Sequence, residues 1–168
     1  GDISTNFLYM MYLCVFNKEL YNEITQLEPK TLYETVDNGE WTLDKFIEIS
    51  SGVFVEQNGD ATPSQGDRFG FVSHNIHFDA FYTGSGLRLV DDDKDGILKV
   101  SDDFDSQKAI DLADKLSAWF SQGDCYVSAR GESFDEDEPF IEGKAVFIQN
   151  RVYMADAQYK SGQGPLRN

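Results

Sequence analysis

An uninterrupted apolar run, FLYMMYLCVF at residues 7–16, constrains the fold of this chain more than any other stretch. It is far shorter than the roughly 20 residues that a membrane-spanning helix needs. A short apolar run of this kind is typical of a strand that is covered on both faces. We therefore predict a fully buried strand over residues 9–16. Within it, Cys14 is expected to be a buried thiol, with a Cys14–Cys125 disulfide as the alternative.

Cap residues and apolar spacing predict further helices and strands along the chain. Asn17, Thr42 and Ser106 are suitable N-cap residues, and the helix after Ser106 has one continuous apolar face. The predicted helical segments are residues 18–24, 43–54, 77–86, 107–122, 139–143 and 151–159. The other predicted strands are residues 68–73 and 144–150, with a hairpin formed by 87–90 and 97–100. Residues 1–168 are expected to form a single mixed α/β domain with more helix than strand.

The charge balance of the chain limits its partners. Thirty Asp and Glu residues stand against 14 Lys and Arg residues, which gives a net charge of −16. Such a surface repels nucleic acid and anionic lipid, so neither is expected as a partner, and it attracts cations. The hydrophobic content of 40% is nevertheless high enough for a packed core.

Two regions of the chain carry a family pattern, and they lie the expected distance apart. The first is LYMMYLCVFNKELYNE at residues 8–23, in which an apolar strand runs into a helix start, followed by LYETVDNGEWTLDKFIEIS at 32–50. The second is PFIEGKAVFIQNRVYMADA at residues 139–157, in which Phe-x-x-Gly-Lys-Ala leads into an apolar strand, a polar turn and a helix. In this order the segments resemble the extracellular solute-binding proteins (family 1) of carbohydrate ABC importers.

The resemblance implies both a fold and a function. It corresponds to part of the C-terminal lobe of a periplasmic-binding-protein-like type II fold, so the N-terminal lobe is expected to be absent from this chain. The implied function is non-catalytic capture of sugars or oligosaccharides in a cleft between two lobes. The implied partners are a carbohydrate ligand and ABC permease subunits. The full-length protein is expected to be a monomer that is extracellular, either membrane-anchored as a lipoprotein or periplasmic.

The resemblance also assigns ligand contacts to two loops. In the family, aromatic side chains on cleft loops bury the apolar face of a sugar ring, while polar neighbours bind its hydroxyls. The loop after residues 144–150 supplies Asn150, Arg151 and Tyr153. The loop after residues 68–73 supplies His74, Asn75, His77 and Phe78. Many relatives have tryptophan at the position of Tyr153, so stacking there is expected to be weaker.

Several of these residues also have a plainer interpretation. Tyr153 begins a predicted helix, a position that is equally compatible with the core, and the helical spacing around Phe78 favours the core for that residue. The alternative for Arg151 is a solvated charge that pairs with Asp156. His74 and His77 are the only histidines of the chain, too few for a zinc site that needs about three or four ligands.

A polar loop, EQNGDATPSQGD at residues 56–67, is the candidate calcium site. Calcium takes about six to eight oxygens, drawn largely from alternating positions of such a loop. The candidate ligands are Glu56, Asn58, Asp60, Thr62 and Asp67. Relatives often have the pattern DxNGDG here, which implies a structural Ca²⁺. Glu56 at the first position and Ala61 at the sixth depart from that pattern.

A second acidic loop, DDDKDGILKVSD at residues 91–102, matches the calcium pattern better by sequence. Asp91, Asp93 and Asp95 stand at alternating positions, and Asp102 stands where the closing ligand would be. Strand-like residues flank the tip, however, and a hairpin would carry Asp102 away from the other three. We therefore predict a solvated hairpin rather than a metal site.

No catalytic pattern accompanies these features. The sequence lacks a Gly-x-Ser-x-Gly elbow, a phosphate-binding loop and a dinucleotide-binding fingerprint. The chain is therefore predicted not to be an enzyme. The alternative function is a calcium-dependent extracellular adhesion or scaffolding module, and a weaker one is a fragment of a carbohydrate-active enzyme with paired carboxylates.

Overall fold

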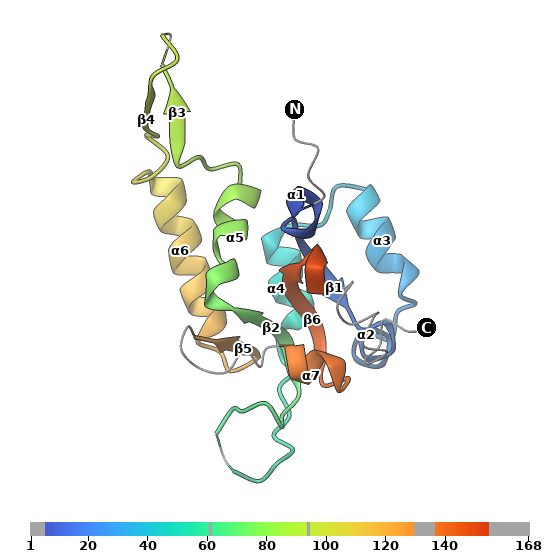
Figure 1. Ribbon diagram of the computed structural model, residues 1–168. Helices are drawn as coiled ribbons and strands as arrows, with labels where there is room; N and C mark the ends of the chain where they lie inside the picture. The colour runs from blue at the N-terminus through green and yellow to red at the C-terminus, as the bar shows by residue number, and fades with distance from the viewer. Residues whose placement is uncertain (1–5, 61, 94, 130–136, 155–168) are drawn as a thin grey trace.

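A four-stranded mixed sheet forms the centre of the structure (Figure 1). The computed structural model describes residues 6–154 apart from residues 61, 94 and 130–136. The strands of the sheet are β1 (Tyr12–Phe16), β2 (Phe69–His74), β5 (Cys125–Ser128) and β6 (Ala145–Arg151). Their order is β1-β6-β2-β5, with β6, β2 and β5 parallel and β1 antiparallel to β6. The predicted mixed α/β class is confirmed.

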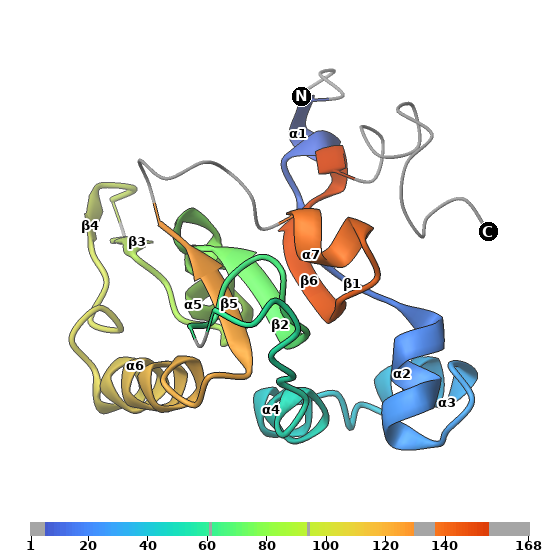
Figure 2. The same cartoon turned by 90° about the horizontal axis from the view of Figure 1, so that it is seen from below.

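Helices pack against both faces of this sheet. The helices are α1 (Asn6–Tyr9), α2 (Lys18–Thr25), α3 (Lys30–Asp37), α4 (Leu43–Ser50), the 3₁₀ helix η1 (Asn75–His77), α5 (Asp79–Gly84), α6 (Gln107–Phe120) and α7 (Asp137–Ile141). In Figure 2, α6, α4, α2 and α3 lie in a row along one face, and α7 lies on the other face. The larger core, around Phe46, Phe71 and Trp119, lies beneath the row. The smaller core, around Phe69 and Phe140, lies beneath α7.

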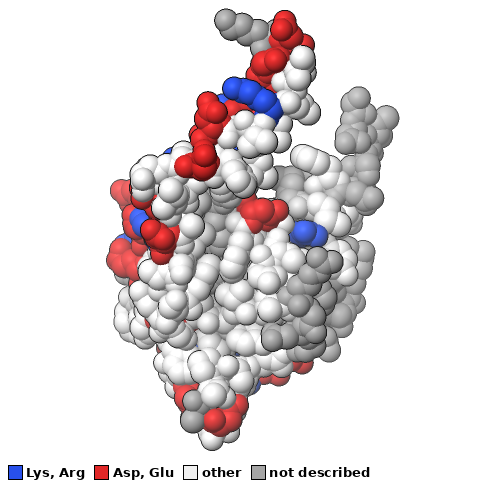
Figure 3. Space-filling model, turned by 90° about the vertical axis from the view of Figure 1, so that its left-hand side faces the viewer, with Lys and Arg blue, Asp and Glu red and all other residues white. Residues whose placement is uncertain are grey.

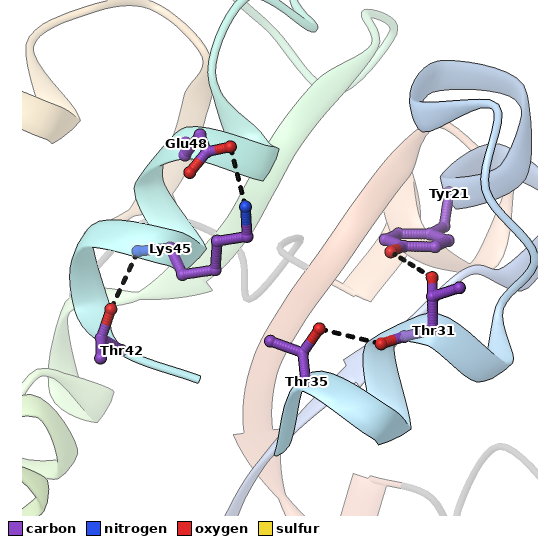
Figure 4. Close-up of polar contacts among 6 residues, drawn as sticks. All are labelled: Tyr21, Thr31, Thr35, Thr42, Lys45 and Glu48. Carbon is purple, nitrogen blue, oxygen red and sulfur yellow. Dashed lines mark hydrogen bonds and ion pairs between the residues drawn. The ribbon is translucent and has the colours of Figure 1, made fainter. Parts of the chain in front are cut away.

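Side-chain caps start three helices where the sequence predicts them. Asn17, Thr42 and Ser106 each accept a hydrogen bond from a backbone N–H two or three residues ahead. Figure 4 shows the Thr42 cap of α4, followed along the helix by an ion pair of 2.8 Å between Lys45 and Glu48. Each cap satisfies an N–H that has no partner inside its helix, so these starts depend on local sequence alone.

The elements α3 and β5 have no counterpart in the predicted pattern. The residue before α3 is Pro29, which supplies no side-chain cap. The helix is instead linked to α2 by a hydrogen bond of 3.1 Å between the hydroxyls of Tyr21 and Thr31 (Figure 4). β5 has only four residues, CYVS, and pairs in parallel with β2. Both elements depend on contacts with other segments, which the local pattern does not contain.

The prediction of a fully buried strand over residues 9–16 is wrong in extent and in burial. β1 begins only at Tyr12, because residues 6–9 form α1. It is the edge strand of the sheet, and Cys14 on it is exposed. Cys14 is therefore not the buried residue that was expected, and because both cysteines are free, the Cys14–Cys125 disulfide is not found either. Burial raises the pKa of the Cys125 thiol to about 12.

The predicted hairpin is confirmed as β3 (Val90–Asp92) paired with β4 (Leu98–Val100). It projects from the body of the molecule beyond the start of α6 (Figure 1). Other predicted boundaries shift by a few residues, since η1 and α5 replace the helix at 77–86 and α7 replaces the one at 139–143. The last predicted helix starts at residues 152–154, and the rest of it lies outside the described residues.

Candidate functional site

The residues predicted to bind ligand lie at the carboxyl ends of two neighbouring parallel strands. β2 ends at His74 and β6 ends at Arg151. After β2 the chain passes through α5, the hairpin and α6 to β5, on the side away from β6. After β6 it turns the other way, and the Val152 N–H donates to the Met11 carbonyl at 2.9 Å beside β1. In open α/β sheets, ligands usually bind at the carboxyl edge where connections diverge in this way.

Arg151 supplies a cation at this carboxyl edge. It is half-buried and lies opposite Tyr12 in the pairing of β6 with β1. Its guanidinium carbon is 5.4 Å from the centre of the Tyr12 ring, its Nη2 donates to the Tyr12 hydroxyl at 3.4 Å, and its Nη1 is 3.5 Å from the Met10 sulfur. The ion pairs among the described residues do not include Arg151. The alternative partner, Asp156, lies outside those residues.

Tyr12 connects Arg151 to an acidic side chain at the start of α5. The Asp79 carboxylate is close enough to Tyr12 to raise the pKa of its hydroxyl. The same hydroxyl donates to the Ile76 carbonyl oxygen at 3.4 Å. Burial is the main cause that raises the pKa of Tyr12, Asp79 raises it further, and Arg151 opposes both. The hydroxyl therefore stays protonated at neutral pH and can both donate and accept hydrogen bonds.

The two histidines lie beneath this edge rather than on its surface. His74 has no exposed surface and His77 has only 3%. The His77 ring meets the Tyr12 ring edge-on at 5.6 Å, and His74 Nδ1 accepts a hydrogen bond from the Ile76 N–H at 3.1 Å. Asn75, between the two, is exposed. The histidines thus support the turn at η1 and the Tyr12 ring, and Asn75 faces solvent.

The remaining predicted contacts divide between the surface and the interior. Tyr153 is 60% exposed just beyond the end of β6, so the core interpretation of this residue is wrong. Asn150 is buried, and its side-chain amide donates to the Asp137 carboxylate at 2.8 Å. Phe78 stacks on Phe120 with ring centres 4.8 Å apart. Phe78 is half-buried, so its ring contacts α6 and keeps part of its surface exposed.

Sequence reasoning missed Tyr12 and Asp79. Tyr12 lies in the apolar run that was expected to be buried, and its contact with Arg151 joins residues that are 139 positions apart. Only the pairing of β1 with β6 brings these two side chains together. Asp79 could have been identified from the sequence. It stands in the first turn of a helix that follows a predicted binding loop, so it is expected to lie near the same edge of the sheet.

The predicted calcium loop lies at the opposite end of β2 from the ligand edge. It enters the strand at Phe69, whereas the ligand edge follows His74. At the end of the loop, Asp67 is fully buried, and its two oxygens accept the backbone N–H groups of Gln57 and Ser64 at 2.8 and 2.9 Å. Asp67 therefore closes the loop through hydrogen bonds to the backbone.

The other candidate calcium ligands form the exposed rim of this loop. Glu56 accepts a hydrogen bond from the Gly59 N–H, Asn58 from the Asp60 N–H, and Asp60 from the Thr62 N–H. The Thr62 hydrogen bond is the main cause that lowers the pKa of the Asp60 carboxyl. In the part of the chain that the structure describes, no three His, Cys, Asp or Glu side chains are gathered as metal ligands.

Calcium is expected to raise the melting temperature of the chain by about 4 °C between chelator and about 5 mM Ca²⁺, as for a weak extracellular site. Asp60→Asn should remove most of this rise, because it removes a charged ligand from the loop. Asp95→Asn, in the hairpin, is the control and should retain it. Differential scanning calorimetry measures both. A rise that survives Asp60→Asn, or no rise in the unmutated chain, would contradict a site in this loop.

The second acidic loop is organised as a hairpin turn. Asp91 pairs with Arg88 at 2.9 Å, and Asp93 accepts two backbone N–H groups of the turn at 2.9 and 2.8 Å. Asp102 lies beyond the base of the hairpin, after the end of β4. In Figure 3, acidic side chains gather along the hairpin at the top and at the loop of residues 56–67 at the bottom. The two acidic loops are therefore too far apart to share an ion.

The helices of the described residues are short, and the longest, α6, has 14 residues. Among those residues, no helix combines the length and the apolar character that crossing a membrane requires. Comparison of the chain with protein-family models, with curated proteins and with solved structures finds no match in any of the three.

Proposed function

We propose that this chain is the C-terminal lobe, of periplasmic-binding-protein-like type II fold, of an extracellular solute-binding protein that captures carbohydrate for an ABC importer. One observation carries the proposal. The two sequence regions that resemble the family, at residues 8–23 and 139–157, contribute Tyr12 and Arg151, which face each other across β1 and β6. They meet at the carboxyl edge of the sheet, where ligands of such sheets bind. The lobe binds ligand without catalysis.

The exposed side chains at this edge suit a sugar. Tyr153 presents an aromatic ring that is 60% exposed, and such a ring covers the apolar C–H face of a sugar. Arg151 donates hydrogen bonds, Asp79 accepts them, and the Tyr12 hydroxyl does both. Neighbouring hydroxyls on a sugar ring need donors and acceptors placed side by side in this way.

A single lobe contacts only one side of the ligand. The affinity of this chain alone is therefore expected to be weaker than about 1 mM. In the two-lobe protein, closure about a hinge would bring a second set of contacts onto the same sugar. The closed, loaded protein would then deliver the sugar to its permease.

Chemical-shift mapping by NMR tests this function with a panel of oligosaccharides at millimolar concentration. The amide signals of residues 75–79 and 150–153, and of Tyr12, are expected to move together. Tyr153→Ala should reduce the apparent affinity by roughly tenfold, because a stacking ring is lost. Tyr33→Ala is the matched control, since Tyr33 is 52% exposed on α3 and should leave the shifts unchanged.

Two results would contradict the proposal in different ways. Micromolar binding by this chain alone would contradict capture by two lobes. Absence of shifts at the edge with every sugar, together with strong stabilisation by calcium, would favour the adhesion or scaffolding alternative instead.

A further inference from the structure

We propose that the ligand of this edge is an acidic sugar, which places a ring carboxylate on Arg151. This inference rests on the proposed carbohydrate function and narrows its ligand class. It starts from the partners that Arg151 has among the described residues, both of which are weak acceptors. One is a thioether sulfur at 3.5 Å, and the other is the Tyr12 hydroxyl at the long distance of 3.4 Å. A guanidinium has five N–H donors in a planar fork, so Arg151 retains the capacity to bind a carboxylate through two parallel hydrogen bonds.

Arg151 differs in this respect from the other arginines that the structure describes. Arg68 pairs with Glu23 at 3.0 Å, and Arg88 pairs with Asp91 at 2.9 Å. Within the described residues, Arg151 is the arginine that is left without one.

The guanidinium of Arg151 is also held in place before any ligand arrives. It lies 5.4 Å from the centre of the Tyr12 ring, and the Tyr12 ring in turn contacts the buried ring of His77 at 5.6 Å. Stacking on an aromatic ring orients the planar fork and removes part of its water. Less side-chain freedom is then lost when a ligand binds, which favours affinity.

Asp79 limits how much negative charge the ligand can carry. Its exposed carboxylate is close enough to Tyr12 to raise the pKa of that hydroxyl, so a ligand on Arg151 meets an anion nearby. Repulsion scales with charge, so a dianionic phosphate is disfavoured more than a single carboxylate. A hydroxyl next to the ligand carboxylate would donate to Asp79. A uronic acid carries both groups on one ring and fits this pair of side chains.

The net charge of −16 does not prevent such binding. Charges farther away than about 8 Å are largely screened at physiological salt, so contacts at the edge decide the affinity. The attraction of a carboxylate to Arg151 is itself electrostatic. The ratio of the affinities for the acidic and the neutral sugar should therefore decrease as the salt concentration rises.

Matched pairs of methyl glycosides test the inference on the whole chain by NMR titration. Methyl glucuronoside is compared with methyl glucoside, and methyl galacturonoside with methyl galactoside, at equal ionic strength. In at least one pair the acid is expected to bind roughly tenfold more tightly than the neutral sugar. Arg151→Gln should bring the ratio of the two affinities to about one. Arg68→Gln, which removes a distant arginine, should keep the ratio of the unmutated chain.

The outcomes separate this inference from the function on which it rests. Neutral sugars that shift the edge signals as strongly as the acids would overturn the inference and leave carbohydrate capture in place. A preference for the acid that survives Arg151→Gln would also overturn it, because the carboxylate would then be bound elsewhere. Absence of edge shifts with both members of every pair would contradict both proposals. The melting temperature of each variant confirms that it is folded.

Discussion

Replacing Gly70 with alanine is expected to prevent the domain from folding. A Cβ atom at this position would lie 1.7 Å from the Ser50 carbonyl oxygen and 2.7 Å from its carbonyl carbon. Both are backbone atoms of the last residue of α4, so no side-chain rotation relieves the overlap. β2 and α4 would have to separate at the larger core, where the Phe46 and Phe71 rings meet at 5.3 Å. The expected loss is more than about 4 kcal/mol, a large part of the stability of a domain.

Urea unfolding followed by tryptophan fluorescence measures this loss, because Trp119 is buried in the same core. Gly84→Ala is the matched control. Gly84 ends α5, and a Cβ there would meet nothing within 4 Å. That variant should change the free energy of unfolding by no more than about 1 kcal/mol. A Gly70→Ala protein that unfolds at the same urea concentration as the unmutated chain would contradict the close approach of α4 to β2.

Replacing Asp124 with alanine is expected to cost about 3–5 kcal/mol of stability. Its buried carboxylate accepts three successive backbone N–H groups, those of Gly52, Val53 and Phe54, at 2.9, 2.8 and 2.9 Å. Its own carbonyl accepts the Gly70 N–H at 2.9 Å. Alanine would leave the three N–H groups without their charged acceptor. The segment after α4 would then lose its connection to the start of β5.

A graded pair of variants distinguishes this role from a general effect of charge. Asp124→Asn keeps one acceptor oxygen in place, so it should cost about half as much as Asp124→Ala. Asp111→Ala removes an equal charge from an exposed position on α6 and should cost less than about 1 kcal/mol. Urea unfolding measures all three. Equal losses for Asp124→Ala and Asp111→Ala would contradict the hydrogen-bonding role of Asp124.

The end of α4 illustrates why some boundaries cannot be predicted locally. Apolar spacing predicts that this helix extends to residue 54, but it ends at Ser50. Gly52 adopts a φ of 73°, and the next N–H groups turn toward Asp124 instead of continuing the helix. The carboxylate that stops the helix comes from a residue 72 positions further along the chain. No window of local sequence contains that information.

The candidate site was predictable only in part, for the same reason. Resemblance to a family placed Arg151 and Tyr153 in one loop and Asn75 in another, and the structure has both loops at one edge of the sheet. It could not identify Tyr12, because the apolar run around that residue is typical of a buried strand. The resemblance also placed Phe78 among the ligand contacts, whereas the ring of this residue packs on Phe120 of α6.

Features that depend on neighbours within a few positions follow from the local sequence. The caps at Asn17, Thr42 and Ser106 and the hairpin of β3 with β4 are of this kind, because each is stabilised by hydrogen bonds over a short loop. The edge position of β1 and the contact of Tyr12 with Arg151 become evident only in the folded domain. Both follow from strand pairing between distant segments, and such pairing depends on burying the whole core rather than on any local pattern.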